Sequence, residues 1–310
     1  MHRRAVSLSL PRFARGLVLA ALVLAVPAGC DKSGGTSDPG GGTDKPSKAG
    51  GIEFAYAESF AIDGQVSVEI ESDSPEGKGA AKIVAKTRLD AAPAAGKTKI
   101  HAKVLELVEF NGSGSLDPEF IKQQMVTAGT ADFDLLATLK TAEEWSIVDA
   151  RGETDDDATK ALAENANPKP MGGDQFGLFV LPDLPSVPLE IGKQVKLPTE
   201  SEEQDMFGQP VPTESDVTWT LVSIGDVGGR KVAKLEVLLE TSGAAELQGG
   251  QAMLSIASEA SFTIEFDVDA KLPISLTGES TQELAFESAG QSGSVQNTTK
   301  FAATYTPAGV

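Results

Sequence analysis

Apolar and polar residues alternate with a period of two along much of this chain. From residue 262 to residue 269, apolar side chains at even positions alternate with polar or acidic ones at odd positions. This period is typical of a strand with one buried face. The same pattern predicts strands at 52–56, 66–70, 100–104, 133–139, 233–239 and 301–305.

The alternation also predicts how these strands associate. Strands with one apolar and one charged face are typical of antiparallel sheets, whereas strands of parallel sheets are apolar on both faces. Residues 226–229 are expected to form a hairpin turn, and 91–98 (AAPAAGKT) a turn between two strands. We therefore expect a mainly β (α+β) fold: an antiparallel curved sheet, a sandwich or a half-barrel, with two or three short helices.

Two segments carry the signals of short helices. Asp117 suits a helix N-cap, Pro118 the first helical position and Gly129 the end of the helix. Leu116 and Ile121 occupy the positions of a hydrophobic staple. Residues 154–168 predict a second helix with an acidic first turn, ended by Pro168, and residues 171–181 predict either a helix or an apolar loop.

A proline-rich connector and an acidic segment separate two strand-rich stretches. Four prolines between residues 182 and 198 predict irregular structure up to Val195, and residues 199–212 predict an acidic loop. We expect a globular domain over 52–310, with possible halves at 52–182 and 195–310. The segment 185–198 resembles a connector of uncharacterised secreted β-rich domains of bacteria.

The first 29 residues have the pattern of a signal peptide. A basic start precedes the apolar run 17–26, and the small residues Ala28 and Gly29 follow. Ten apolar residues are too few for a membrane-spanning helix, which needs about 20.

The residues after this run, Ala28, Gly29 and Cys30, resemble the lipobox of bacterial lipoproteins, although Pro27 stands where that family usually has an aliphatic residue. The resemblance implies cleavage between Gly29 and Cys30 and lipidation of Cys30. It also implies a protein anchored by its lipid in the bacterial cell envelope, at the inner or outer membrane, with its domain in the periplasm or at the cell surface. The alternative is an ordinary leader that leaves a free thiol.

Residues 30–51 are predicted to be a flexible tether behind this anchor. They contain glycine, serine and proline and no large apolar side chain, so they cannot bury enough surface to fold. Because Cys30 is the only cysteine, no intramolecular disulfide can form.

The charge balance limits the partners of the protein. The chain has 45 acidic against 26 basic residues, a formal charge of −19. This balance argues against nucleic acid and against docking on anionic lipid. Strong acidity also suits calcium, and clusters at Glu153/Asp155/Asp156/Asp157 and Glu200/Glu202/Glu203/Asp205 carry suitable ligands, although the first is better explained by a helix N-terminus.

Residues typical of enzymes are scarce. After the leader, His101 is the one histidine, and alternation places it with Lys99 and Lys103 on a solvated face. Trp219 alternates with apolar residues and is expected in the core, whereas Trp145 is expected to be partly exposed. We expect no cofactor, no metal and no catalytic residues.

These observations favour a non-enzymatic binding or envelope-structural protein, whose partner is an apolar ligand or an envelope protein. A sharper hypothesis is a carrier of lipid or another apolar ligand, with a curved sheet covered by the helix at 117–128 and by Phe176 and Phe179. Such a molecule would resemble periplasmic lipoprotein carriers in outline. The competing hypothesis is a hydrolase that uses two carboxylates.

Overall fold

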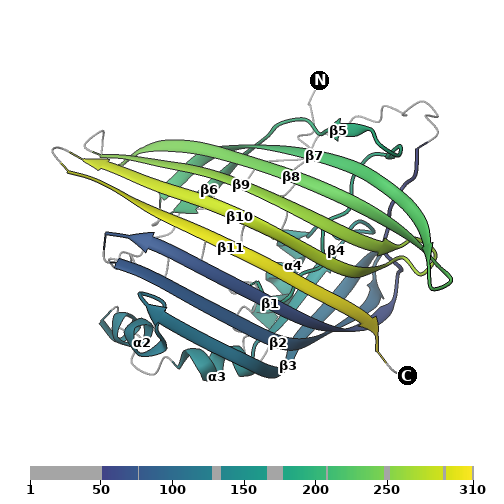
Figure 1. Ribbon diagram of the computed structural model, residues 1–310, viewed down its shortest axis with the longest axis horizontal. Coiled ribbons are helices and arrows are strands. Elements are labelled where there is room, and N and C mark those ends of the chain that lie inside the picture. Colours follow the sequence, from purple (N-terminus) through teal and green to yellow (C-terminus); the bar gives the residue numbers. More distant parts are fainter. Residues whose placement is uncertain are drawn as a thin grey trace.

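One curved antiparallel sheet forms most of the molecule (Figure 1). The computed structural model describes residues 51–75, 77–127, 134–165, 177–206, 209–247, 252–288 and 291–308. Within these residues the sheet has eleven strands in the order β4-β3-β2-β1-β11-β10-β9-β8-β7-β5, and β6 also pairs with β7. The strands are β1 (Phe60–Ser74), β2 (Gly77–Ala94), β3 (Lys97–Gly114), β4 (Glu143–Val148), β5 (Gln194–Lys196), β6 (Glu200–Met206), β7 (Gln209–Val227), β8 (Arg230–Leu247), β9 (Ala252–Asp267), β10 (Leu272–Ser288) and β11 (Gln291–Pro307).

The sheet is open, and its middle joins the two strand-rich halves of the chain. The outermost strands β4 and β5 do not pair with each other in the described structure, so the sheet is not closed into a barrel. At its centre β1 pairs with β11, with Val66 opposite Ala303. The expected mainly β fold with a curved antiparallel sheet and short helices is therefore confirmed.

Tight turns connect neighbouring strands at what we call the proximal end of the sheet. Gly228 and Gly229 both have positive φ between β7 and β8, as do Ala95 and Gly96 between β2 and β3. Two consecutive residues with positive φ match the right-handed twist of a hairpin. Both predicted turns are confirmed. The opposite end, where β8 ends at Leu247 and β10 at Ser288, is called the distal end.

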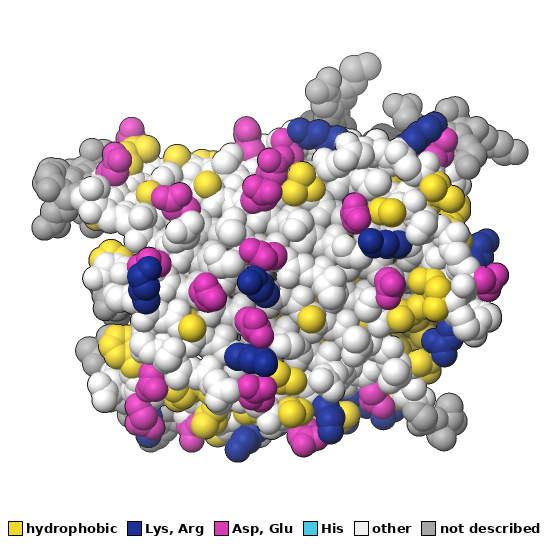
Figure 2. Space-filling model, viewed as in Figure 1, with side chains coloured by type: hydrophobic (Ala, Val, Ile, Leu, Met, Phe, Trp, Pro, Cys, Tyr) yellow, Lys and Arg dark blue, Asp and Glu magenta, His cyan; other side chains and the backbone are white. Residues whose placement is uncertain are grey.

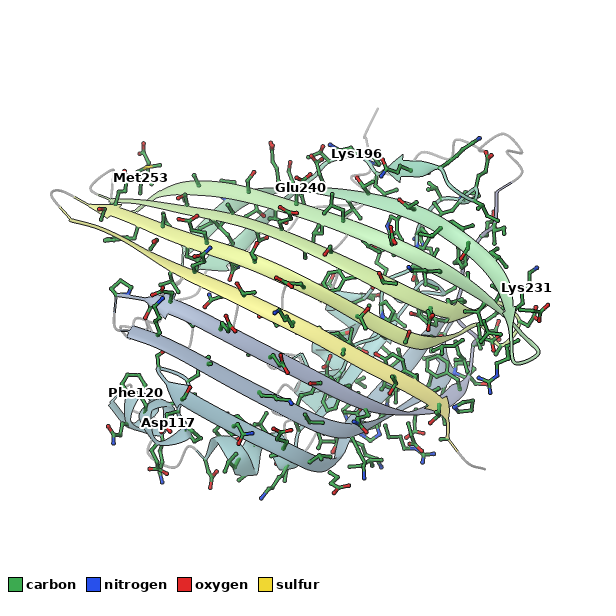
Figure 3. All side chains as sticks on the ribbon, in the orientation of Figure 1. Asp117, Phe120, Lys196, Lys231, Glu240 and Met253 are labelled. Atoms are coloured by element: carbon green, nitrogen blue, oxygen red, sulfur yellow. The ribbon has the colours of Figure 1, made fainter. Side chains whose placement is uncertain are left out.

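Two of the three described helices follow the predicted signals. α2 (Pro118–Thr127) begins after Asp117, whose carboxylate accepts hydrogen bonds from the backbone N–H of Glu119 and Phe120 (Figure 3). Leu116 and Ile121 are both buried, as a hydrophobic staple requires. α4 (Asp156–Asn165) is the second predicted helix. The predicted ends at Gly129 and Pro168 lie outside the described residues.

Residues 133–139 do not form the predicted strand. Leu135–Lys140 form the helix α3, whose N-cap Asp134 accepts a hydrogen bond from the backbone N–H of Ala137. The apolar residues at every second position also include Leu135 and Leu139, which are four residues apart and lie on one buried helical face. Seven residues are too few for alternation to distinguish a strand from a helix. Phe133 lies outside the described residues.

Two other predictions need correction, and some strands were missed. The acidic segment 199–212 is not a loop, because β6 and the start of β7 pair there from Glu200↔Ser215 to Met206↔Gln209. The segment 52–56 has the expected buried Phe54 and Tyr56, but its only described pairing is a bridge between Ile52 and Leu189. The edge strand β4 and the long strand β10 were not predicted from the sequence.

The proline-rich connector forms a buried segment that we call the strap, residues 177–192. As predicted, it has no regular secondary structure up to Gln194. Leu178, Leu181 and Leu184 are buried in the main core. The backbone N–H of Leu184 donates to the carbonyl of Arg151 after β4, and the N–H of Gly192 donates to the carbonyl of Leu221 in β7. The strap thus connects the two sides of the open sheet at the proximal end.

Both tyrosines of the chain hold the strap in place. The Tyr56 hydroxyl donates to the Pro182 carbonyl, and the Tyr305 hydroxyl donates to the Val180 carbonyl, each at 2.5 Å. Both side chains are buried. Burial raises the pKa of both hydroxyls well above the ordinary tyrosine range.

The two faces of the sheet differ in character. Alternate residues of the long strands point into the main core, which also takes in the strap and residues of α2 and α3. The other face carries scattered acidic, basic and hydrophobic side chains (Figure 2). We call these the inner and outer faces.

Candidate functional site

A row of polar residues crosses the inner face of the sheet. Ser72 in β1 pairs with Asn297 in β11, and Asn297 pairs with Gln282 in β10. The row continues through β9, β8 and β7, with register pairs Gln282↔Ser258, Ser258↔Thr241 and Thr241↔Ser215. Directly opposed residues of neighbouring strands lie on one face, so these six residues form a continuous line. With strands about 4.8 Å apart, the line is roughly 24 Å long. We call it the polar ladder.

Five of the six ladder residues are buried, Ser258 is partly exposed, and part of the ladder lacks hydrogen-bond partners. Gln282 is 5% exposed and Asn297 is 7% exposed. Ser215 and Thr241 share a hydrogen bond of 2.9 Å between their hydroxyls. In contrast, Oε1 of Gln282 and Nδ2 of Asn297 are buried and have no partner in the described structure. An unpaired buried polar atom costs about 1–3 kcal/mol, so the pair needs a physical explanation.

Apolar residues lie on both sides of the ladder along most of the strands, whereas Ser280 and Thr299 adjoin it on the proximal side in β10 and β11. Towards the distal end, the next inner-face residues beyond Gln282 and Ser258 are Leu284 and Ile256. They belong to a small buried cluster with Val211 and Leu254. Towards the proximal end, the inner face continues into the main core, whose next rows include Leu239, Phe262 and Trp219. The ladder therefore separates the two apolar clusters of the described sheet.

Phe286 lies at the distal end of the inner face. Its register with Leu254 and Gly293 places it on the same face as Gln282 and Leu284. Its side chain is 42% exposed. The apolar lining of the inner face therefore reaches solvent at the distal end.

Met253 has the same exposure on the other face. It neighbours Leu254 in β9, pairs with Glu287 and is also 42% exposed (Figure 3). The two residues thus form a matched pair on opposite faces.

The predicted position of His101 on the outer face is confirmed. Its ring stacks on Trp145 in β4 with centroids 3.9 Å apart, and Lys99 Nζ lies 4.0 Å from the Trp145 ring centroid. His101 Nε2 is hydrogen-bonded to Glu143 at 2.6 Å. Trp145 is partly exposed, and Trp219 is buried in the core, as expected. This cluster fastens the edge strand β4 to β3.

The first acidic cluster is divided between two structural roles. Asp155 caps α4 by accepting from the backbone N–H of Ala158, and its carboxylate also binds the Lys97 ammonium. These contacts, the Ala158 N–H first, lower the pKa of Asp155. Glu153 pairs instead with Arg151. Among the described residues no group of three or more histidine, cysteine or acidic side chains could hold a metal ion.

Other predicted sites lie outside the described part of the structure. These are Gly29, Cys30, Phe176 and the side chains of Asp156, Glu200, Glu202, Glu203 and Asp205. Phe179 is buried in the strap.

Two pockets elsewhere on the described surface differ from the ladder. A trough of 690 Å³ on the outer face is lined largely by solvent-facing residues such as Thr263, Glu279 and Lys300. A pocket of 170 Å³ at the proximal end contains Arg230 and Asp267. Asp267 accepts from the backbone N–H of Asp269 and Ala270, so it shapes the turn after β9. The hydrolase hypothesis remains a prediction.

Comparison with known proteins places the chain in no family. No protein-family model matches it, and no curated protein is similar to it in sequence. None of the described helices has the length and apolar character needed to cross a membrane.

The polar ladder was missed in the sequence. Each ladder residue stands at a position where the every-second-residue pattern of its strand would place a buried apolar side chain. Thr241, for example, follows Leu235, Val237 and Leu239. Polar residues at core positions were a detectable signal, but their alignment across six strands depends on register.

Proposed function

We propose that this chain is a lipid-anchored protein of the bacterial cell envelope that binds a lipid or other apolar ligand on the inner face of its curved sheet. The observation that carries the proposal is the exposed Phe286, which extends the apolar inner face to solvent at the distal end. Large apolar side chains that face the interior of a sheet are normally covered, and an uncovered one marks a place where apolar molecules can bind.

The shape of the sheet supports this proposal. An open sheet with helices and a strap against its inner side can accept a ligand between its layers without unfolding a closed structure. The described hydrogen bonds of the strap to other segments involve Ile52, Tyr56, Arg151, Leu221 and Tyr305, and those to the sheet lie in its proximal half. Ligand entry at the distal end therefore leaves these contacts intact.

The reason for proposing a lipid anchor is the sequence at Ala28, Gly29 and Cys30. Lipidation of Cys30 would attach the domain to a membrane through a tether of residues 30–51, which spans about 25 Å as a flexible coil. The tether enters the domain beside Ile52, which bridges to Leu189 of the strap. With such an anchor the proximal end would be the tethered end, and the distal end would be free to exchange ligand.

Fluorescence quenching tests binding at this face. In a chain purified from the envelope and carrying Trp145→Phe, Phe286→Trp places an indole at the distal inner face. Dibromostearoyl glycerol, whose bromine atoms quench indoles on contact, is expected to quench this fluorescence saturably. Trp219 is 5% exposed and supplies a constant background.

Met253→Trp in the same background is the matched control. Met253 is equally exposed and lies at the same end on the outer face. Quenching confined to the Phe286→Trp chain supports the proposal. Equal quenching of both chains indicates adsorption to the surface, and either equal quenching or no quenching would refute binding at the inner face.

A further inference from the structure

The unpaired amide groups of the polar ladder identify the class of ligand. Resting on the proposed function, we propose that the ligand is an uncharged amphiphile whose hydroxyl or amide group binds at Gln282 and Asn297, with its hydrocarbon chain running towards Phe286. An acylglycerol is a ligand of this class.

The two unpaired atoms are complementary in kind, and they belong to neighbouring residues of two paired strands. Gln282 and Asn297 are direct cross-strand partners, which places their Cβ atoms about 4.5–5.5 Å apart. Oε1 of Gln282 accepts hydrogen bonds and Nδ2 of Asn297 donates them. A ligand hydroxyl can donate to the first and accept from the second. One hydroxyl or secondary amide therefore satisfies both atoms.

The surroundings of the pair select an uncharged group. The ladder contains hydroxyls and amides and no ionisable side chain. The adjoining inner-face residues of β10 and β11 are Ser280, Thr299, Leu284 and Val295, which are also uncharged. A carboxylate or phosphate bound here would lose its hydration and find no cation, which is far more costly than burying a hydroxyl.

The apolar residues beyond the ladder give the direction of the hydrocarbon chain. Leu284 and Phe286 follow Gln282 at alternate positions of β10, and Ile256 and Leu254 lie opposite them in β9. From Gln282 to Phe286 the strand rises about 13 Å. A chain along this path would remain in contact with apolar side chains until it reaches solvent.

The test compares two ligands with the same hydrocarbon chain in the Phe286→Trp, Trp145→Phe protein. Dibromostearoyl glycerol presents hydroxyls and an ester, whereas dibromostearate presents a carboxylate at neutral pH. The glycerol ester is expected to bind at least about tenfold more tightly, which corresponds to about 1.4 kcal/mol. Equal affinities, or tighter binding of the carboxylate, would overturn the inference.

Two substitutions test the residues themselves. The double variant Gln282→Met, Asn297→Leu keeps the approximate side-chain volumes and removes both polar groups. Binding of the glycerol ester should therefore weaken about tenfold, while binding of dibromostearate is unchanged. Because unpaired polar groups are removed, the melting temperature of the unliganded protein should rise, by about 2–4 °C per group. Loss of binding therefore cannot be attributed to unfolding, and a falling melting temperature would contradict the unpaired state.

Thr281→Val is the matched control, since Thr281 precedes Gln282 and is exposed on the outer face. It should leave both affinities unchanged. The outcomes separate the two proposals. Absence of quenching by either lipid refutes the proposed function, whereas equal quenching by both, or an unaffected double variant, refutes only the assignment of the ladder.

Discussion

At the scale of single residues, the two tyrosines show how burial and hydrogen bonding act together. Each hydroxyl donates to a carbonyl of the strap, which has no strand or helix to satisfy its backbone. Tyr56 also packs edge-on against Phe266, with ring centroids 5.7 Å apart. The strap is therefore held by specific polar contacts within an apolar core.

This burial predicts the alkaline behaviour of the protein. Because the pKa of both hydroxyls is raised in the folded state, their contribution to stability is complete below about pH 10 and is lost as the pH rises above that value. Tyrosinate absorbance should therefore appear together with the loss of the strand signal in circular dichroism. Tyrosinate in a protein with intact strands would contradict the burial.

Single substitutions provide the control for this titration. Tyr56→Phe and Tyr305→Phe should each remove about half of the tyrosinate signal, since the chain has two tyrosines. Each should also lower the free energy of unfolding by about 1–3 kcal/mol, because a buried carbonyl of the strap loses its donor.

Residue environments were predictable where they depend only on a residue's neighbours along the chain. Alternation alone placed Trp219 inside and His101 outside. It could not show that Gln282 lies beside Asn297, because that proximity depends on the register of two strands. The candidate site was therefore not visible in the sequence.

At the scale of elements, local capping signals were more reliable than short alternating patterns. Asp117 and Pro118 predicted α2 because capping is a contact within one turn. The pattern at 133–139 was interpreted as a strand, although Asp134 is the N-cap of α3. Asp134 satisfies a backbone N–H that a strand would direct to a neighbouring strand, and this contact favours the helix.

The cap of α4 predicts a measurable pH dependence. Asp155→Ala should lower the free energy of unfolding by about 1 kcal/mol at neutral pH, whereas Asp155→Asn should cost less because asparagine also caps helices. The pKa of Asp155 is lowered in the folded state, so its contribution is present above about pH 4 and is lost as the pH falls through the lowered pKa. Denaturant unfolding at neutral and acidic pH measures both effects, and a difference between wild type and Asp155→Ala that stayed constant with pH would contradict them.

At the scale of the whole molecule, the strands of both sequence halves belong to one sheet. β1 to β4 come from the first half and β5 to β11 from the second, and the halves meet at the β1–β11 pair. The sheet class could be predicted because alternation specifies strand type. The strand order could not, because nothing local in β1 identifies β11 as its partner.

The proposed lipid anchor on Cys30 would determine the position of the molecule in the cell. If Cys30 carries the lipid, cells that express the wild-type chain should incorporate labelled palmitate into it, and Cys30→Ser should abolish the label. Fractionation should then find the wild type with membranes and the variant released from them. Equal labelling of the two chains would rule out the lipobox. Labelling of the wild type alone would support the anchor, and the quenching experiments test separately whether the inner face binds a ligand.

The β1–β11 pair also fixes the order in which the molecule can be completed during synthesis. Because a chain is made from its N-terminus, β1, β2 and β3 are available first, and these can associate as hairpins at once. The free edge of β1, however, has to wait until residues 291–307 arrive, and contacts between such distant segments form slowly. Until then an apolar strand edge is exposed in the middle of the future sheet, and such edges readily pair with other chains. The last strand therefore limits both the time to fold and the period of greatest vulnerability to aggregation.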